Sequence, residues 1–105
     1  MSKITELNDA FRRTFVGGKV VMTAGVTAMN PVAQLVVVAK VKDFEEFSKD
    51  VDPYGEHDFG SFEVAGQKFF WKIDYYAPDM EGGSEDPSDP TKTTRVLTIM
   101  LADEY

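Results

Sequence analysis

The 105-residue sequence contains no cysteine, one histidine (His57) and one tryptophan (Trp71). The absence of cysteine excludes disulfides, thiolate metal sites and thiol nucleophiles, and it is typical of a reducing compartment. A transition-metal site normally needs more than one imidazole or a thiolate, and neither is available. We therefore expect no metal and no cofactor, and few side chains remain for enzyme chemistry. An oxygen-only site for a hard cation stays open as an alternative at the acids of the loop 77–92: Asp79, Glu81, Glu85, Asp86 and Asp89.

Long hydrophobic runs are also missing. The longest apolar-rich stretch, residues 32–41, is interrupted by Gln34 and Lys40 and is shorter than the roughly 20 residues that a membrane span requires. The N-terminus is amphipathic and lacks the basic region followed by an apolar segment that marks a signal peptide. The sequence predicts a cytoplasmic protein without membrane contact.

Positive charge is scarce in the middle of the chain, within a net charge of −7. Residues 43–90 contain three lysines against fourteen acids, whereas residues 1–42 contain six basic residues against two acids. The electrostatic field of these acids opposes the binding of phosphate groups, so direct nucleic-acid binding is not expected. A basic protein partner would be attracted by the same field. The length and the ordinary globular composition predict a single domain spanning residues 1–105.

Apolar residues at helical spacing predict a first helix over residues 3–15, with Ser2 as its N-cap. Arg12 and Arg13 lie late in this helix and suit its macrodipole. We expect both arginines to be solvated at the surface, in preference to forming an anion site.

A strand is expected over residues 19–23, followed by a flexible segment of small residues at 24–29. A second helix is expected over residues 31–42, because Asn30 is a good N-cap and Pro31 suits the first helical position. The apolar stripe of this helix comprises Val32, Leu35, Val36 and Ala39.

The C-terminal half is organised around an aromatic β-hairpin, with strands at 57–64 and 67–76. Residues 43–50 are expected to form a strand, with a continued helix as the alternative, and lead into a turn at 52–55. An acidic loop, residues 77–92, precedes an interior strand at 93–102. In the second hairpin strand, alternation turns four residues toward the helices: Phe69, Trp71, Ile73 and Tyr75.

These elements predict an α+β fold in which two helices pack on one face of a mostly antiparallel sheet of four or five strands. The order of elements is α-β-α-β-β-β-β. The other face of the sheet is half polar, and it is either covered in part by the following loop or available to a partner. This outer face carries Phe70, Lys72, Asp74 and Tyr76.

The cluster Glu56, His57 and Asp58 is the one candidate for acid-base chemistry. A small hydrolase would need Glu56, His57 and Asp74 to converge in one cleft. The plainer alternative is that His57 hydrogen-bonds a carboxylate and fixes the entry to the hairpin, because a lone histidine without a supporting motif is weak evidence of catalysis.

Four blocks of the sequence carry a resemblance: LNDAFRRTF at 7–15, GEHDFG at 55–60, FFWKIDYY at 69–76 and TRVLTIMLA at 94–102. They are similar to those of a family of short bacterial proteins, many of them alphaproteobacterial or carried by mobile elements, known only as a domain of unknown function. The resemblance covers nearly the whole chain. It implies no activity and no catalytic residues.

The function that the sequence favours is a non-catalytic accessory protein that binds a basic protein partner. It would act as an inhibitor or a nucleic-acid mimic, in a mobile-element or phage-defence setting. The hydrolase is the alternative, and homodimer formation stays open. The candidate contact residues are exposed aromatic residues, the outer face of the hairpin and nearby acids: Tyr54, Asp58, Phe70, Lys72, Asp74, Tyr76, Asp79, Glu81, Glu85 and Asp86.

Overall fold

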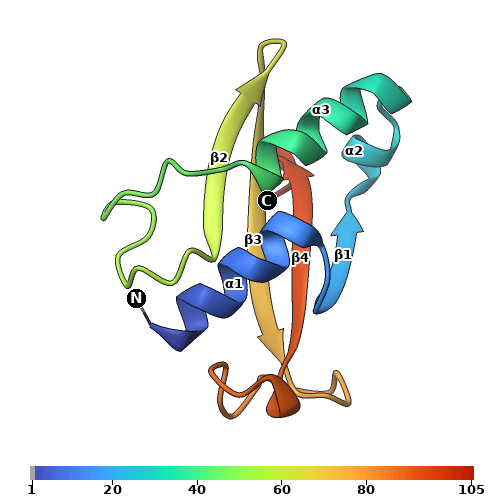
Figure 1. The fold of residues 1–105 in the computed structure, drawn as a ribbon. Helices are drawn as coiled ribbons and strands as arrows, with labels where there is room; N and C mark the ends of the chain where they lie inside the picture. The colour runs from blue at the N-terminus through green and yellow to red at the C-terminus, as the bar shows by residue number, and fades with distance from the viewer. Residues whose placement is uncertain (1) are drawn as a thin grey trace.

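The computed structural model describes residues 2–105 and has an α+β fold built on a four-stranded sheet (Figure 1). The strands lie in the spatial order β1-β4-β3-β2. The pairs β2/β3 and β3/β4 are antiparallel, but β1 runs parallel to β4, so the sheet is mixed. The strands are β1 (Gly18–Met22), β2 (Phe59–Val64), β3 (Gln67–Tyr76) and β4 (Thr94–Leu101).

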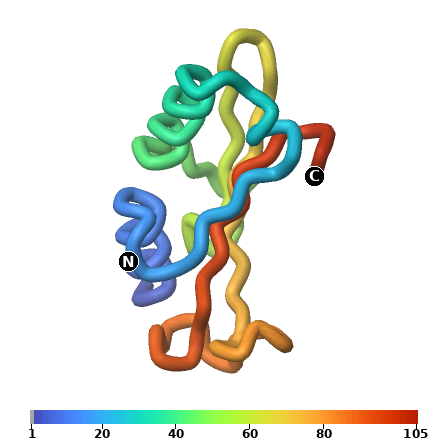
Figure 2. Tube along the Cα trace, turned by 90° about the vertical axis from the view of Figure 1, so that its right-hand side faces the viewer, coloured from blue at the N-terminus to red at the C-terminus, as the bar shows by residue number. Residues whose placement is uncertain are grey.

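Three helices accompany the sheet: α1 (Lys3–Thr14), the short α2 (Ala24–Thr27) and α3 (Pro31–Lys42). Figure 2 shows α1 and α3 together on one side of the sheet. The predicted caps are confirmed, since the side chains of Ser2 and Asn30 accept hydrogen bonds from backbone N–H groups of α1 and α3. The prediction of a flexible segment at residues 24–29 is wrong, because these residues contain α2. No helix within residues 2–105 is long and apolar enough to cross a membrane.

The core lies between the sheet and the helices, and the predicted alternation in β3 is confirmed. Phe69, Trp71 and Ile73 are buried on the helix-facing side. Strand β4, which was expected to be interior, lies between β1 and β3 and contributes Leu97 and Ile99 to the same core.

The prediction of a strand at residues 43–50 is wrong, and so is the alternative of a continued helix, because this segment has no regular secondary structure. Phe44 and Phe47 are three residues apart and both turn toward the core, which a strand of period two does not allow. Their ring centroids are 5.0 Å apart, and each ring meets Trp71 edge-on. The turn at 52–55 is confirmed by a hydrogen bond from the N–H of Gly55 to the carbonyl of Asp52.

The expected solvation of Arg12 is also wrong. Its side chain is fully buried, and Nη2 lies 3.1 Å from Oδ1 of Asp9. Position 12 shares the inward face of α1 with other buried polar residues, whereas Arg13 points outward and pairs with Glu45 at 3.2 Å. The two arginines therefore have different roles despite being neighbours.

Candidate partner-binding groove

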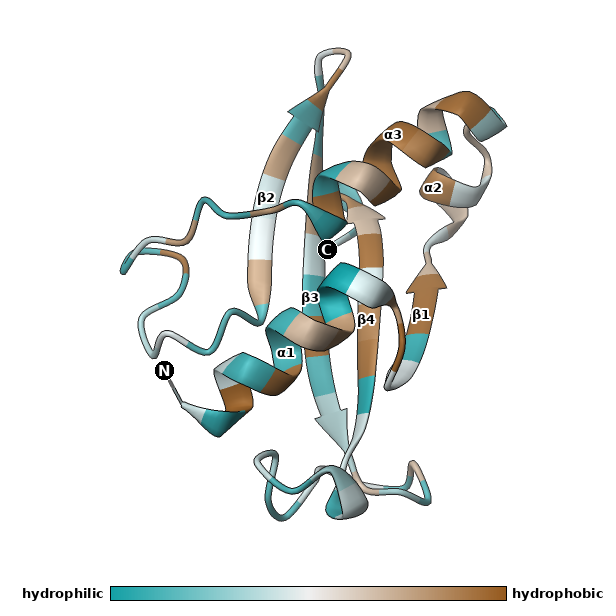
Figure 3. Cartoon of the chain, in the orientation of Figure 1, coloured by the Kyte–Doolittle hydropathy of each residue, from teal (hydrophilic) through white to brown (hydrophobic). Residues whose placement is uncertain are grey.

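Helix α3 is apolar on two opposite faces. Val37 and Val41 are completely buried against the sheet. At 100° per residue, the stripe noted in the sequence lies on the other side of the helix and faces solvent. In this stripe Val32 is 71% exposed, Leu35 is 69% exposed and Val36 is 42% exposed, and Ala39 is exposed as well. Figure 3 shows this apolar character along α3.

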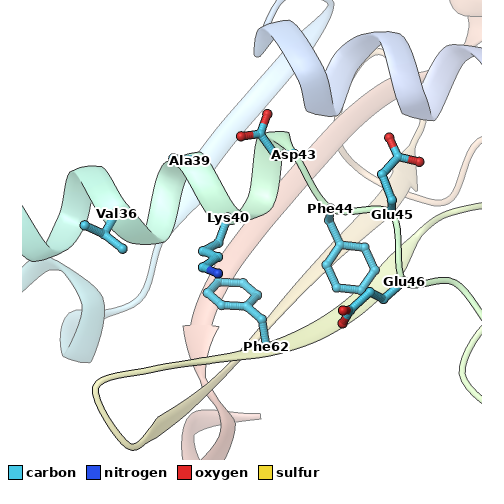
Figure 4. A pocket seen from close by; sticks show the side chains of 8 residues that line it. All are labelled: Val36, Ala39, Lys40, Asp43, Phe44, Glu45, Glu46 and Phe62. Atoms are coloured by element: carbon cyan, nitrogen blue, oxygen red, sulfur yellow. The ribbon is translucent and has the colours of Figure 1, made fainter.

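A hollow of about 500 Å³ continues this stripe toward strand β2. Phe44 and Phe62 supply its aromatic wall, and Val36 and Ala39 belong to both the stripe and the hollow (Figure 4). We name the combined surface the α3 groove. It comprises the stripe residues Val32, Leu35, Val36 and Ala39, together with Lys40, Asp43, Phe44, Glu45, Glu46 and Phe62.

The aromatic wall of the groove rests on the core. The ring of Phe44 packs edge-on against Trp71, with 5.6 Å between centroids, and Phe62 stacks on Phe69 at 5.5 Å. Gly60 makes this packing possible, because a Cβ at that position would run into the rings of both Trp71 and Phe44. These contacts attach the aromatic wall of the groove to the core.

Both ends of α3 are fixed by side-chain hydrogen bonds. At the start, Gln34 Nε2 donates to the carbonyl oxygens of Thr27 and Met29, each at 3.0 Å. At the end, Arg12 Nη1 donates to the carbonyl oxygens of Val41 and Lys42, each at 3.0 Å. The helix that carries the exposed stripe is therefore anchored to α1 and to the segment that precedes it.

One end of the groove is lined by three acids, Asp43, Glu45 and Glu46, together with Lys40. Residues 43–58 contain four further acids, which are not part of the groove lining. In Figure 4, Glu46 turns toward the Phe44 ring, whereas Asp43 and Glu45 point to the α1 side. Burial raises the pKa of Asp58, and the nearby charge of Glu56 raises it further. The crowding of acids along this segment favours a positively charged neighbour.

The candidate catalytic residues do not converge. His57 Nδ1 lies 2.9 Å from Oδ1 of Asp9, so the expected bond between His57 and a carboxylate is confirmed. Glu56 accepts a hydrogen bond of 2.9 Å from the hydroxyl of Tyr75, whose pKa is raised chiefly by burial. Asp74 pairs with Lys72 at 2.9 Å on the opposite sheet face, so no Glu56–His57–Asp74 cleft exists.

The predicted contact residues are spread over several parts of the surface. Tyr54 is 87% exposed in the turn, and Asp58 lies half-buried just before β2. The outer sheet face holds Phe70, Lys72, Asp74 and Tyr76, where the Tyr105 ring packs edge-on against Phe70. The loop of residues 77–92, to which Asp79, Glu81, Glu85 and Asp86 belong, lies at one end of the sheet and not over that face (Figures 1 and 2).

The acidic loop forms hydrogen bonds within itself. Asp86 accepts from the N–H of Ser88 at 3.1 Å, and Asp89 accepts from the N–H of Thr91 at 2.9 Å. Among residues 2–105, no three His, Asp or Glu side chains are arranged to hold a metal ion. The loop acids are therefore partly engaged by their own backbone.

The prediction from sequence omitted most of the α3 groove. Its signal was present in helix 31–42, where apolar residues occupy nearly every position and only one face can pack on the sheet. Phe44 and Phe62 carried no comparable signal, because they meet only in the folded chain.

Comparison with known proteins identifies a family. The model of a family described as "Protein of unknown function (DUF3768)" matches residues 22–104, which is most of the chain. No curated protein and no solved structure gives a match. The resemblance to a domain of unknown function is thereby confirmed, and the chain belongs to the DUF3768 family.

Proposed function

We propose that this protein is a non-catalytic binding protein whose α3 groove holds an apolar, basic segment of a partner protein. The observation that carries the proposal is the exposed stripe of Val32, Leu35 and Val36 on an anchored helix, next to an acidic segment. Contiguous apolar surface of this kind, rimmed by polar residues, is typical of interaction sites.

The two parts of the groove have different physical roles. Burial of the stripe and of the partly exposed Phe62 supplies affinity, since each Å² of apolar surface removed from water contributes about 25 cal/mol before the costs of association. The lining acids Asp43, Glu45 and Glu46 attract basic partners and repel acidic ones, which affects association rate and specificity more than affinity.

The proposal extends the function that the sequence favoured. A chain with a net charge of −7 that captures a basic segment is suited to act as an inhibitor or accessory factor, including one that imitates nucleic acid. A cytoplasmic setting, in a bacterium or on a mobile element, belongs to the same proposal. We place the contact surface on α3, whereas the sequence favoured the outer face of the sheet.

The test is capture of partners from a native lysate of the source cells at low salt, using the wild-type chain and two variants. Leu35→Lys places a charge in the groove, and Val16→Lys makes the same kind of change at a position that is 74% exposed and outside it. We expect a basic protein to bind the wild type and Val16→Lys, to be lost with Leu35→Lys, and to dissociate as salt rises. Recovery of no partner, or equal recovery with both variants, would overturn the proposal.

A further inference from the structure

We infer that the segment bound in the α3 groove is an amphipathic α-helix whose basic residues gather at one end. This inference rests on the proposed function and specifies the partner's structure. Helix-in-groove recognition of this kind uses apolar anchors at i, i+3, i+4 and i+7.

The exposed stripe has the spacing of a helix-binding surface. Val32, Leu35, Val36 and Ala39 stand at i, i+3, i+4 and i+7, over roughly 10 Å at 1.5 Å per residue. Ridges and grooves with this period accept the side chains of a second helix. The small side chain of Ala39 allows the two axes to approach to about 8–10 Å.

The backbone of α3 offers no hydrogen-bond partners to a segment laid on the stripe. The interior N–H and C=O groups of α3 are paired within the helix, and Arg12 satisfies two carbonyls at its end. An extended segment laid on the stripe would therefore find no backbone partners and would bury its own polar groups unpaired. A helix pairs those groups internally, so it can cover an apolar surface without that cost.

The charged side chains of the groove lie at one of its ends. Residues 31–39 contain no charged side chain, and charge begins at Lys40 and continues with Asp43, Glu45 and Glu46. The bound helix is therefore uncharged where it faces Val32 and Leu35, and basic where it passes Glu46, the acid that turns toward the Phe44 ring. Between these regions, one large apolar side chain enters the hollow between Phe44 and Phe62.

The test uses two synthetic 16-residue peptides of identical composition, containing leucine, alanine, glutamine and lysine. In the first, leucines stand at i, i+3, i+4 and i+7 and lysines gather at one end. In the second, leucines alternate with polar residues, as in a strand. Binding to the full chain is measured by fluorescence anisotropy, and peptide helicity by circular dichroism with isotope-edited infrared spectra of the complex.

We expect the first peptide to bind at least tenfold more tightly than the second and to become helical in the complex. Leu35→Lys and Val32→Lys should each weaken it at least tenfold, whereas Val16→Lys should leave binding unchanged. Two variants are used so that misfolding of one does not decide the result. Tighter or equal binding of the alternating peptide, with the same sensitivity to Leu35→Lys, would contradict the inference that the bound segment is helical. The proposed function would not be affected by that result.

If neither peptide binds, the inference that the partner segment is helical is also contradicted. The lysate capture described above then decides the proposed function independently. Binding of the alternating peptide that is insensitive to Leu35→Lys would instead point to strand addition at the free edge of β2, and it would contradict the inference as well.

Discussion

Arg12 lies fully buried beneath the end of α3, where its Nη1 donates a hydrogen bond of 3.0 Å to the carbonyl oxygen of Val41. A cation at a helix C-terminus interacts favourably with the helix dipole. The same guanidinium pairs with Asp9 of α1, so one side chain connects the two helices that cover the sheet. The position of the α3 groove depends on this contact.

Replacing Arg12 with Met should lower the free energy of unfolding by about 3–5 kcal/mol, because the buried Asp9 carboxylate loses its cation and two carbonyls of α3 lose their donor. Urea denaturation measures this difference. The control is Arg13→Met, which removes an exposed pair with Glu45 and should change stability by less than about 1 kcal/mol. Equal effects of the two substitutions would show that Arg12 is not a structural cation.

Gly60→Ala should destabilise the protein by about 1–3 kcal/mol, because the added methyl group overlaps the rings of Trp71 and Phe44 and the core has to shift. The matched control is Gly82→Ala, where a Cβ meets nothing within 4 Å. Thermal denaturation of both variants gives the comparison. A Gly60→Ala variant as stable as the control would mean that the groove wall is looser than described.

Much of the fold could be predicted because its signals are local. The N-caps Ser2 and Asn30 and the alternation of β3 depend on neighbours in the chain, and the structure confirms them. The parallel pairing of β1 with β4 joins distant segments and left no local signal. The burial of Arg12 likewise depends on its contact with Val41 of α3, which lies 29 residues away along the chain.

The candidate site was harder to predict for the same reason. Helix 31–42 showed an apolar stripe, but the choice of buried face is made by packing against the sheet. The structure buries Val37 and Val41 and leaves Val32 and Leu35 in solvent. The hollow needs Phe62 from the hairpin, so it appears only when α3 and β2 are placed together.

Asp58→Asn should stabilise the protein at neutral pH. Burial and the charge of Glu56 raise the pKa of Asp58 in the folded chain above its ordinary value of 3.8, so the folded state binds this proton more tightly than the unfolded state. The contribution of Asp58 to stability is therefore present below pH 3.8 and is lost as pH rises through the raised pKa.

The gain from Asp58→Asn should be under about 1 kcal/mol, since solvent screens a half-exposed carboxylate. It should shrink toward zero as the pH approaches 3.8. Urea titrations from pH 3.5 to 7 measure this difference, with Asp50→Asn at an exposed site as the control. A gain that is independent of pH would contradict the role assigned to the Asp58 charge.

Leu35→Lys should leave the free energy of unfolding within about 0.5 kcal/mol of the wild type, because the side chain is already 69% exposed. Val37→Lys buries a charge in the core and should prevent folding. Circular dichroism and urea denaturation distinguish the two. A large loss with Leu35→Lys would mean that the stripe is part of the core of the free protein.

The most direct test of the α3 groove is site-specific crosslinking in the source cells, with a photoreactive phenylalanine analogue at position 35 or, as the control, at the exposed position 54. We expect a discrete crosslink to a basic protein from position 35, absent from position 54 and suppressed by Glu46→Lys together with Asp43→Lys. Crosslinks from position 54 alone, or the same products from both positions, would contradict it.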